Sequence, residues 1–383
     1  MSVTVIGDHD ERTVAQLERC VRAEDGAVGV LCADGHVGYS QPVGGAVAYR
    51  DHISVSGVGY DIGCGNKAVR TDLRHDDIVA DLPRIMDAIV SRISFGVGRH
   101  NDEPVDHPVL DAIRHADAVR QRSLVDLAAR QLGTVGSGNH YVDLFADEED
   151  AVWVGVHFGS RGFGHKTATS YLALAGEHPG GMDAAPSLLR VDSELGQEYI
   201  AAMQLAGEYA YAGRDLVVSR VLDILGAGET FSVHNHHNFA WRETHDGSDW
   251  WVVRKGCTPA FPGQQGFVGS TMGETSVILE GADTPAARAT FFSTVHGAGR
   301  RMSRTQAKGK KGRPGLIDYD RVRAELRERG IELRGGAADE APDAYKRLDQ
   351  VLAAHGDSIR VRHRLTPIGV AMAGPDIADP YRD

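Results

Sequence analysis

Apolar residues follow two different spacings along this chain, and together they predict a mixture of strands and helices. Short Val-rich runs bounded by turn residues predict strands, among them 27–32, 43–49, 53–58, 151–158 and 250–254. A helical period of the apolar residues predicts helices at 14–21, 76–93, 110–132, 193–225, 319–327 and 344–355. The two kinds of element do not alternate regularly, so the pattern favours an α+β fold over a doubly wound parallel sheet.

The chain contains no internal repeat and no low-complexity tract that would divide it. Residues 332–342 are rich in Gly and Ala, which makes them a candidate linker. Glycine-framed motifs that carry polar side chains are spread between Asp34 and Arg300. A site built from such distant segments indicates a single integrated domain over residues 1–383.

Composition narrows the class of protein. With 42% hydrophobic and 25% charged residues, the sequence is that of a soluble globular protein. No apolar run approaches the roughly 20 residues of a membrane helix, and the first residues lack the pattern of a secretory signal. The four cysteines show no CxxC spacing, which favours a reducing cytoplasm over a disulfide framework.

The charge is unevenly distributed. A net charge of -12 counts against a nucleic-acid-binding protein, because such proteins are usually basic. Residues 300–313, however, carry seven Lys or Arg residues and no acid. This run is either a solvated loop or a surface that binds phosphates.

The segment Asp61-Ile62-Gly63-Cys64-Gly65 presents a carboxylate and a thiol between glycines, which allow tight turns and close approach of a ligand. Four further glycine- or asparagine-containing motifs supply histidines: His140, His157, the pair His236 and His237, and His296. Carboxylate, thiolate and imidazole ligands together suit Mn, Fe, Co or Zn better than Mg or Ca. The sequence therefore predicts a transition-metal site.

Two assignments stay open from the residues alone. Alternation along a strand places His234 and His236 on one face and His237 on the other, without showing which face holds a metal. His296 precedes the small residues 297–299 and is either a nucleophile on a tight turn or a fifth metal ligand.

Cations accompany these motifs. Arg161, Lys255 and Arg300 each lie in a glycine-containing motif and could neutralise charge on a phosphoryl group. Other histidines, such as His36, are expected to be ordinary polar residues.

Eight motifs in one order span nearly the whole chain: Asp34-Gly35-His36-Val37-Gly38-Tyr39, Gly59-Tyr60-Asp61-Ile62-Gly63-Cys64-Gly65, Gly136-Ser137-Gly138-Asn139-His140, His157-Phe158-Gly159-Ser160-Arg161-Gly162, His236-His237-Asn238, Arg254-Lys255-Gly256, Gly269-Ser270-Thr271-Met272-Gly273 and His296-Gly297-Ala298-Gly299-Arg300. With these motifs the chain resembles the RtcB family of 3′-phosphate RNA ligases. The resemblance implies an α+β domain of a fold peculiar to that family, two Mn²⁺ ions and GTP.

The resemblance also implies roles for individual residues. One ion would be held by Asp61, Cys64 and His140, and the second by Cys64, His157 and His237, so that Cys64 bridges the two. His296 would be the nucleophile that accepts GMP. The residues that would line the guanylate site are Asn139, His140, Tyr141, Val142, Asp143, His237, Asn238, Gly269, Ser270, Thr271, Met272, Ser276, His296, Gly297, Ala298 and Gly299.

The implied reaction joins an RNA 2′,3′-cyclic phosphate or 3′-phosphate end to a 5′-hydroxyl end through a histidine–GMP intermediate, as in tRNA splicing or RNA repair. Two alternatives remain: a dinuclear metal phosphohydrolase acting on RNA ends or nucleotides, and a non-catalytic sensor of RNA ends or nucleotides. The sequence also leaves open whether an activating protein takes part.

One departure from the family pattern concerns the nucleotide. The family typically closes with a lysine that contacts guanine, but residues 369–374 of this chain contain no lysine. The preference for GTP over ATP is therefore open.

Overall fold

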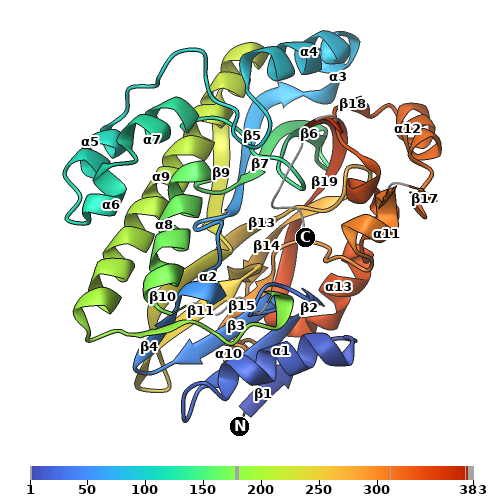
Figure 1. The fold of residues 1–383 in the computed structure, drawn as a ribbon. Coiled ribbons are helices and arrows are strands. Elements are labelled where there is room, and N and C mark those ends of the chain that lie inside the picture. The colour runs from blue at the N-terminus through green and yellow to red at the C-terminus, as the bar shows by residue number, and fades with distance from the viewer. Residues whose placement is uncertain (1, 177–180, 311, 376, 378–383) are drawn as a thin grey trace.

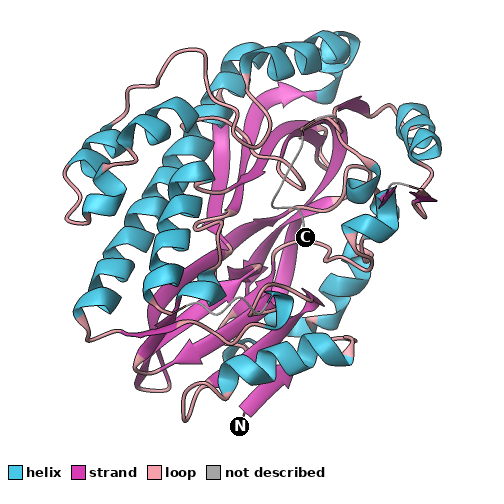
Figure 2. Ribbon diagram, in the orientation of Figure 1, coloured by secondary structure: helices cyan, strands magenta, loops and turns pink. Residues whose placement is uncertain are grey.

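The structure is a computed structural model that describes residues 2–176, 181–310, 312–375 and 377. Strands occupy the centre of the molecule and helices lie around them (Figures 1 and 2). Helices and strands are mixed along the chain, which confirms the predicted α+β fold. That one domain spans all of residues 1–383 stays a prediction.

Five strands form the first sheet, in the order β1-β2-β3-β11-β10. Their bounds are Ser2–Val5 (β1), Val28–His36 (β2), Val43–Tyr49 (β3), Asn238–His245 (β10) and Ser248–Lys255 (β11). Only the β1–β2 pair within this sheet is parallel.

The second sheet follows the order β13-β14-β19-β6-β7-β5-β9, with β18 paired to β19. Its strands are Gly65–Arg74 (β5), Tyr141–Ala146 (β6), Ala151–Phe158 (β7), Glu229–His236 (β9), Gln265–Val268 (β13), Ser276–Gly281 (β14), Glu332–Arg334 (β18) and Ile359–Met372 (β19). Strand β9 ends at His236 in this sheet and β10 begins at Asn238 in the other. The chain therefore passes from one sheet to the other at His237.

Three short ladders complete the strands. They pair His52–Ser54 (β4) with Leu188–Arg190 (β8), Cys257–Pro259 (β12) with Ser293–Val295 (β15), and Gly309–Lys310 (β16) with Arg313–Pro314 (β17).

Helices surround the sheets (Figure 2). Their bounds are Glu11–Val21 (α1), Val55–Val58 (α2), His75–Ile78 (α3), Leu82–Arg92 (α4), Pro108–Arg114 (α5), Val119–Arg122 (α6), Val125–Gln131 (α7), Arg161–Leu174 (α8), Glu194–Leu225 (α9), Pro285–Ala289 (α10), Arg304–Lys308 (α11), Tyr319–Glu328 (α12) and Leu348–Ala354 (α13). Single 3₁₀ turns lie at Val79–Asp81, Gly181–Asp183, Ala338–Glu340, Pro342–Ala344 and Gly356–Ser358. Among the described residues, no helix combines the length and the apolar character needed to cross a membrane.

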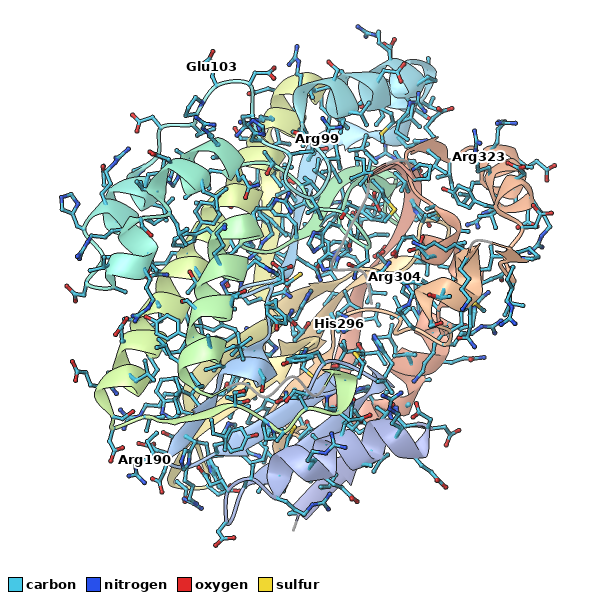
Figure 3. The ribbon with its side chains drawn as sticks, viewed as in Figure 1. Arg99, Glu103, Arg190, His296, Arg304 and Arg323 are labelled. Carbon is cyan, nitrogen blue, oxygen red and sulfur yellow. The ribbon has the colours of Figure 1, made fainter. Side chains whose placement is uncertain are left out.

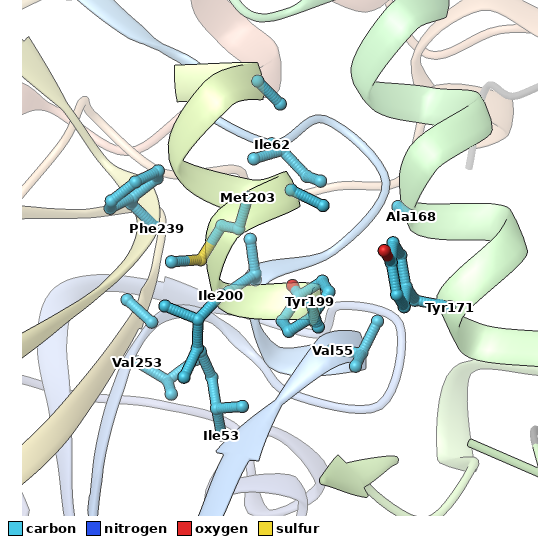
Figure 4. Packing of buried hydrophobic residues seen from close by; sticks show 14 of the residues in the cluster. Ile53, Val55, Ile62, Ala168, Tyr171, Tyr199, Ile200, Met203, Phe239 and Val253 are labelled. Carbon is cyan, nitrogen blue, oxygen red and sulfur yellow. The ribbon is translucent and has the colours of Figure 1, made fainter. Parts of the chain in front are cut away.

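Helix α9 is the longest element, and it packs against α8, α4 and β7. Ser193 caps its first turn by accepting from the N–H of Gly196, and Gly226 ends it in the left-handed conformation. Its buried side chains, such as Met203, join a hydrophobic cluster that also contains Ile62 (Figure 4). Ile62 is fully buried there, and it anchors the segment that carries Asp61 and Cys64 in the core.

Several predicted elements match closely: the strands at 43–49 and 151–158 and the long helix at 193–225. The prediction for 53–58 is half wrong, because the strand ends at Ser54. The Ser54 hydroxyl then accepts from the N–H of Gly57 and begins the short helix α2.

Two long predicted helices are interrupted. The 76–93 segment forms α3, a 3₁₀ turn and α4, because Pro83 starts a new helix at the beginning of α4. The 110–132 segment forms α5, α6 and α7. Gln121 of α6 donates to the carbonyl of Ala202 in α9, so tertiary contacts turn this segment away from a straight helix.

The expectation of a linker at 332–342 is wrong. Residues Glu332–Arg334 form β18, which pairs in parallel with the end of β19. Asp339 and Glu340 follow and are buried, where they face arginines of the basic run. Small residues in this segment therefore reflect close packing.

Candidate metal centre

Four neighbouring strands of the second sheet bring the predicted ligands to one end. Cys64 directly precedes Gly65, the first residue of β5, and Gly65 stands opposite both Phe158 of β7 and His236 of β9. His157 is the next-to-last residue of β7. On the other side of β7, Tyr141 is the first residue of β6 and stands opposite His157. His140 directly precedes Tyr141, so it lies at the same end of the sheet.

The turn before β5 carries two ligands. Asp61 accepts from the N–H of Cys64 through its main-chain carbonyl, at 3.1 Å. Gly63 between them has φ +70°, a conformation that favours glycine. A β-carbon at Gly63 would also lie 3.1 Å from that of Ala210 in α9, so this turn requires a residue without a side chain.

The five residues form two groups that share one sulfur. Cys64, His157 and His237 make the first group, and Asp61, Cys64 and His140 make the second. Cys64 Sγ lies 3.3 Å from His157 Nε2 and 3.6 Å from His140 Nε2, and His140 Nε2 lies 3.2 Å from Asp61 Oδ2. Tetrahedral ligands bound at 2.0–2.3 Å are separated by about 3.3–3.8 Å, so these distances suit a metal.

The hydrogen bonds around the histidines also fit metal binding. His157 Nδ1 lies 3.0 Å from the Asn139 carbonyl, which fixes the ring and leaves Nε2 toward Cys64. The Nδ1 atoms of His140 and His237 are buried and have no hydrogen-bond partner among the described residues. Burying a ring nitrogen without a hydrogen-bond partner destabilises the fold unless a ligand binds to it. The buried Nδ1 of His237 is therefore available to bind a metal ion.

The protonation of the site also suits a cation. Burial lowers the pKa of His157 and His237 well below their ordinary value, which keeps both rings neutral. Burial would raise the pKa of Asp61, but hydrogen bonding and charge from His140 bring it to about 2. Burial and the Asp61 carboxylate raise the pKa of the Cys64 thiol, an effect that a bound divalent ion would reverse.

His296 lies directly beside this centre. It follows β15 and its ring centroid is 4.9 Å from that of His237. Nδ1 of His296 lies 2.6 Å from Oδ2 of Asp34, and the same oxygen accepts from the backbone N–H of His296 at 2.9 Å. With Nδ1 held by a carboxylate, Nε2 is the nitrogen left to react. Neither of the two metal-ligating groups includes His296.

His234 and His236, at the end of β9, face away from the metal centre and toward helix α9. His234 and His236 both contact Arg214 of α9, as expected for residues on one face. His237 lies on the other side, with ring centroids 5.1 Å from His157. The alternation predicted from the sequence therefore holds, and His237 is the histidine that faces the other ligands.

The residues expected around a guanylate come from both strands and loops, and some of these segments contact one another. A β-carbon on Gly297 would lie 3.2 Å from the Gly269 carbonyl, and Gly269 itself packs against the Tyr141 hydroxyl. Among the described residues, buried polar atoms without partners include Tyr141 Oη, Asp143 Oδ1, Ser270 Oγ and Thr271 Oγ1. These atoms would satisfy the polar edge of a nucleotide.

Other members of that set have structural contacts. Asn238 accepts from the N–H of Gly256, and the Ser276 hydroxyl accepts from the N–H of Ser270. The side chains of Val142, Met272 and Ala298 lie in hydrophobic clusters, so only their backbone could meet a nucleotide.

The predicted phosphate-neutralising cations are held by protein groups. Arg161 donates to the Gly96 carbonyl and to Thr134, and Lys255 donates to the Tyr39 carbonyl. Arg300 donates to the Tyr345 hydroxyl at 2.9 Å. These hydrogen bonds hold the three cationic side chains in fixed positions.

The basic run divides in two. Arg304 pairs with Asp339 and Glu340, and Lys308 lies 3.7 Å from Asp339. Figure 3 labels Arg304 and His296 in the central part of the view. Lys310 is exposed in the β16–β17 hairpin, whereas Lys311 lies outside the described residues.

Two residues of the site were not predicted from the sequence. Asp34 was noted only as part of a motif, although a carboxylate at the end of an apolar strand was a usable signal. Arg214 lies between apolar residues of the long helix, and a lone arginine on such a buried face was the second signal. Both are completely buried.

Comparison with known proteins agrees with this geometry. A family model described as tRNA-splicing ligase RtcB matches residues 12–123 and 102–373. The tRNA-splicing ligase RtcB of Thermococcus kodakarensis is 33% identical, over 89% of this chain and 87% of the relative. The RNA-splicing ligases RtcB of Escherichia coli (31%, over 88% and 87%) and Mycobacterium tuberculosis (32%, over 93% and 98%) are similar. On this match across most of its length, the chain belongs to the tRNA-splicing ligase RtcB family.

Proposed function

We propose that the chain is an RNA ligase that uses GTP and Mn²⁺ to join a 2′,3′-cyclic phosphate or 3′-phosphate end to a 5′-hydroxyl end. One observation carries the proposal: His296, held by Asp34, lies against His237 of a centre that could hold two metal ions. A nucleophilic histidine beside two cation sites suits nucleotidyl transfer.

His296 performs the first covalent step on the nucleotide. Its Nε2 attacks the α-phosphorus of GTP, a P–N bond forms, and the bond to the pyrophosphate oxygen breaks. Asp34 accepts a hydrogen bond from Nδ1–H and stabilises the positive charge that the ring gains. The product is a histidine–GMP adduct.

The RNA ends then react. Water opens a 2′,3′-cyclic phosphate to a 3′-phosphate, whose oxygen attacks the α-phosphorus and breaks the P–N bond to His296. The 5′-hydroxyl of the second RNA attacks the RNA phosphorus, and GMP leaves. Transfer of GMP to the RNA 3′-phosphate turns a poor leaving group on the RNA phosphorus into a good one.

Metal chemistry fits the residues that are present. Asp61, Cys64 and His140 would hold one ion, and Cys64, His157 and His237 the other. Two such ions, when bound, neutralise and orient phosphoryl oxygens. We propose Mn²⁺, although this set of donors also accepts Co²⁺ and Zn²⁺.

We propose GTP as the nucleotide. Asp143 of β6 is buried beside Ala371 of β19, in the stretch that lacks a lysine. Burial raises the pKa of Asp143 well above its ordinary value, although the N–H of Ala371 donates to it. ATP therefore has to be compared directly with GTP.

The place of action is proposed from the cysteines. All four are unpaired and buried, which suits a reducing cytoplasm. Natural RNA substrates and an activating protein are separate questions from the chemistry.

The test is an analysis of products. A labelled RNA with a 2′,3′-cyclic phosphate and a partner with a 5′-hydroxyl are incubated with the protein, Mn²⁺ and GTP. The proposal predicts a joined strand that needs both Mn²⁺ and nucleotide. Release of phosphate without joining would favour the phosphohydrolase, and binding without any product would favour the sensor.

A further inference from the structure

Arg214 is a completely buried arginine that connects three segments of the candidate metal centre. Its Nη1 donates to the Gly63 carbonyl at 2.9 Å and to the Phe158 carbonyl at 2.5 Å. Its Nη2 lies 3.0 Å from Nδ1 of His236, and its Nε donates to His234 Nε2 at 2.8 Å. The Arg214 side chain thus contacts the turn that precedes β5, the end of β7 and the end of β9.

Each of three partners is next to a candidate ligand in the chain. Gly63 precedes Cys64, Phe158 follows His157, and His236 precedes His237. The two carbonyls accept from one planar guanidinium that also contacts the His236 imidazole, and these contacts fix the relative positions of the three segments. The other two candidate ligands, Asp61 and His140, are next to none of these three partners.

Helix α9 is shaped to bring Arg214 to this place. Ala210 and Gly207 lie one and two turns earlier on the same face as Arg214. A β-carbon on Gly63 would lie 3.1 Å from Cβ of Ala210 and 3.2 Å from Cα of Gly207. Small residues therefore let the metal-binding turn approach the helix, and the arginine then spans the gap to both strands.

The chemical type of the residue is also informative. Burying a guanidinium without a bonded carboxylate is expensive. The partners of Arg214 among the described residues are two carbonyls and two imidazoles. Burial lowers the pKa of Arg214, whereas nearby negative charge, including that of the Asp61 carboxylate, favours its positive form.

We infer that Arg214 is a positioning residue of the dinuclear metal centre, which holds the segments of Cys64, His157 and His237 at ligating distance. This inference rests on the proposed function in one respect, namely that the centre binds metal. Arg214 itself belongs to neither group of candidate ligands. Without Arg214 the donor atoms should remain, but their spacing should be lost.

The test measures metal binding on metal-free protein. Arg214→Lys keeps the charge but offers one compact ammonium instead of a planar fork. Mn²⁺ affinity is measured by calorimetry, and Co²⁺ binding by the absorption of the cobalt–thiolate charge transfer. We expect affinity about 10–100-fold weaker and a shifted or weakened absorption band, since outer contacts of metal ligands have effects of this size.

Arg220→Lys is the matched control. Arg220 lies on the same helix, is partly buried, and donates to the Gly133 carbonyl at 2.7 Å. Both variants should unfold at lower urea concentrations than the wild type, but only Arg214→Lys should lose metal affinity. Equal losses of affinity in both variants would overturn the inference, because the effect would then be general destabilisation.

A second variant covers the case in which Arg214→Lys does not fold. Gly207→Ala keeps Arg214 and all its donors, but its β-carbon would lie 2.7 Å from the Phe239 ring and 3.2 Å from Nε2 of His236. It should separate α9 from the centre and weaken metal binding several-fold. The inference is overturned if folded Arg214→Lys binds metal with wild-type affinity and shows the wild-type cobalt band. If only Gly207→Ala folds, the same result in that variant overturns it. Either result leaves the proposed metal centre itself intact. A wild-type protein that binds neither ion would overturn the proposed metal centre as well.

Discussion

Asp34 and His296 are 262 residues apart in the chain, yet Oδ2 of Asp34 lies 2.6 Å from Nδ1 of His296. The carboxylate also accepts the backbone N–H of His296, so it fixes both the ring and the turn that carries it. Its side chain is completely buried, whereas that of His296 is 13% exposed. Asp34 therefore orients a histidine that a substrate can reach.

Asp34→Asn should slow the formation of the histidine–GMP adduct by roughly a hundredfold or more, because the carboxylate that orients the reacting histidine and stabilises its charge is lost. An amide can hold the ring, but it does not stabilise the charge on the attacking imidazole and it permits the wrong tautomer. Initial rates with labelled GTP measure this effect.

Asp147→Asn is the control for a buried carboxylate in general. Asp147 accepts from the indole N–H of Trp153 at 2.8 Å and lies in a turn after β6. That variant should lose stability but keep its rate of adduct formation. A rate in Asp34→Asn equal to that of Asp147→Asn would contradict the orienting role.

Acid should remove the stability that Asp34 supplies. Burial alone would raise the pKa of Asp34, but charge and hydrogen bonds from His296 lower it below its ordinary 3.8. Such a carboxyl stabilises the fold above its unfolded pKa and loses that contribution as the pH falls through the folded pKa. In urea titrations, the difference in free energy of unfolding between wild type and Asp34→Asn should shrink below about pH 4. A difference that grows with acidity would have the wrong sign.

Cys64 belongs to both groups of ligands, so its removal should affect both ions. Metal content of Cys64→Ala should fall from two ions per chain to none, and RNA joining should be lost with it. His140→Ala should lose one ion and keep the other, because His140 belongs to one group. Elemental analysis after gel filtration measures the stoichiometry.

Cys20→Ala supplies the matched control for Cys64. Cys20 is also buried, but it lies in a hydrophobic cluster, where its thiol donates a hydrogen bond to the Ser40 carbonyl. It should retain both ions. If Cys64→Ala also retained two ions, the shared-ligand arrangement would be wrong.

The exposed end of the basic run should bind RNA phosphates. Replacing Lys308, Lys310 and Lys311 with Gln should weaken RNA binding most at low salt. The slope of log affinity against log salt should fall by up to about 2, since each phosphate contact on a single strand contributes about 0.7. Fluorescence anisotropy over a salt series measures this slope.

A control for net charge changes three other exposed arginines, Arg84, Arg114 and Arg190, to Gln. Each pairs with a nearby aspartate, so the net charge changes equally without loss of the hairpin's cations. An unchanged slope in the lysine variant, or an equal loss in this control, would make the run an ordinary surface loop.

The sequence predicted the fold best where periodicity and burial agree. The helix at α9 and the strands β3 and β7 are long and strongly patterned, and their bounds match. The 76–93 segment is less regular because Pro83 begins a new helix inside it. The linker prediction failed because Gly and Ala at 332–342 allow close packing as well as flexibility.

Motif spacing identified the polar side chains that converge, but not the contacts that hold them. Gly63 and Cys64 could be expected in a tight turn from the sequence alone. Asp34 and Arg214 act through distant partners, which depend on tertiary structure that periodicity does not report. The sequence analysis therefore missed Asp34 and Arg214 because their contacts depend on long-range packing.

The central claim is that His296 becomes covalently attached to GMP. The most direct measurement incubates metal-reconstituted protein with Mn²⁺ and α-labelled GTP, beside His296→Ala and with ATP in parallel. The account predicts an acid-labile label on the wild type alone, at least with GTP. No label with either nucleotide, on protein shown to hold its metals, or an equal label on His296→Ala, would contradict it.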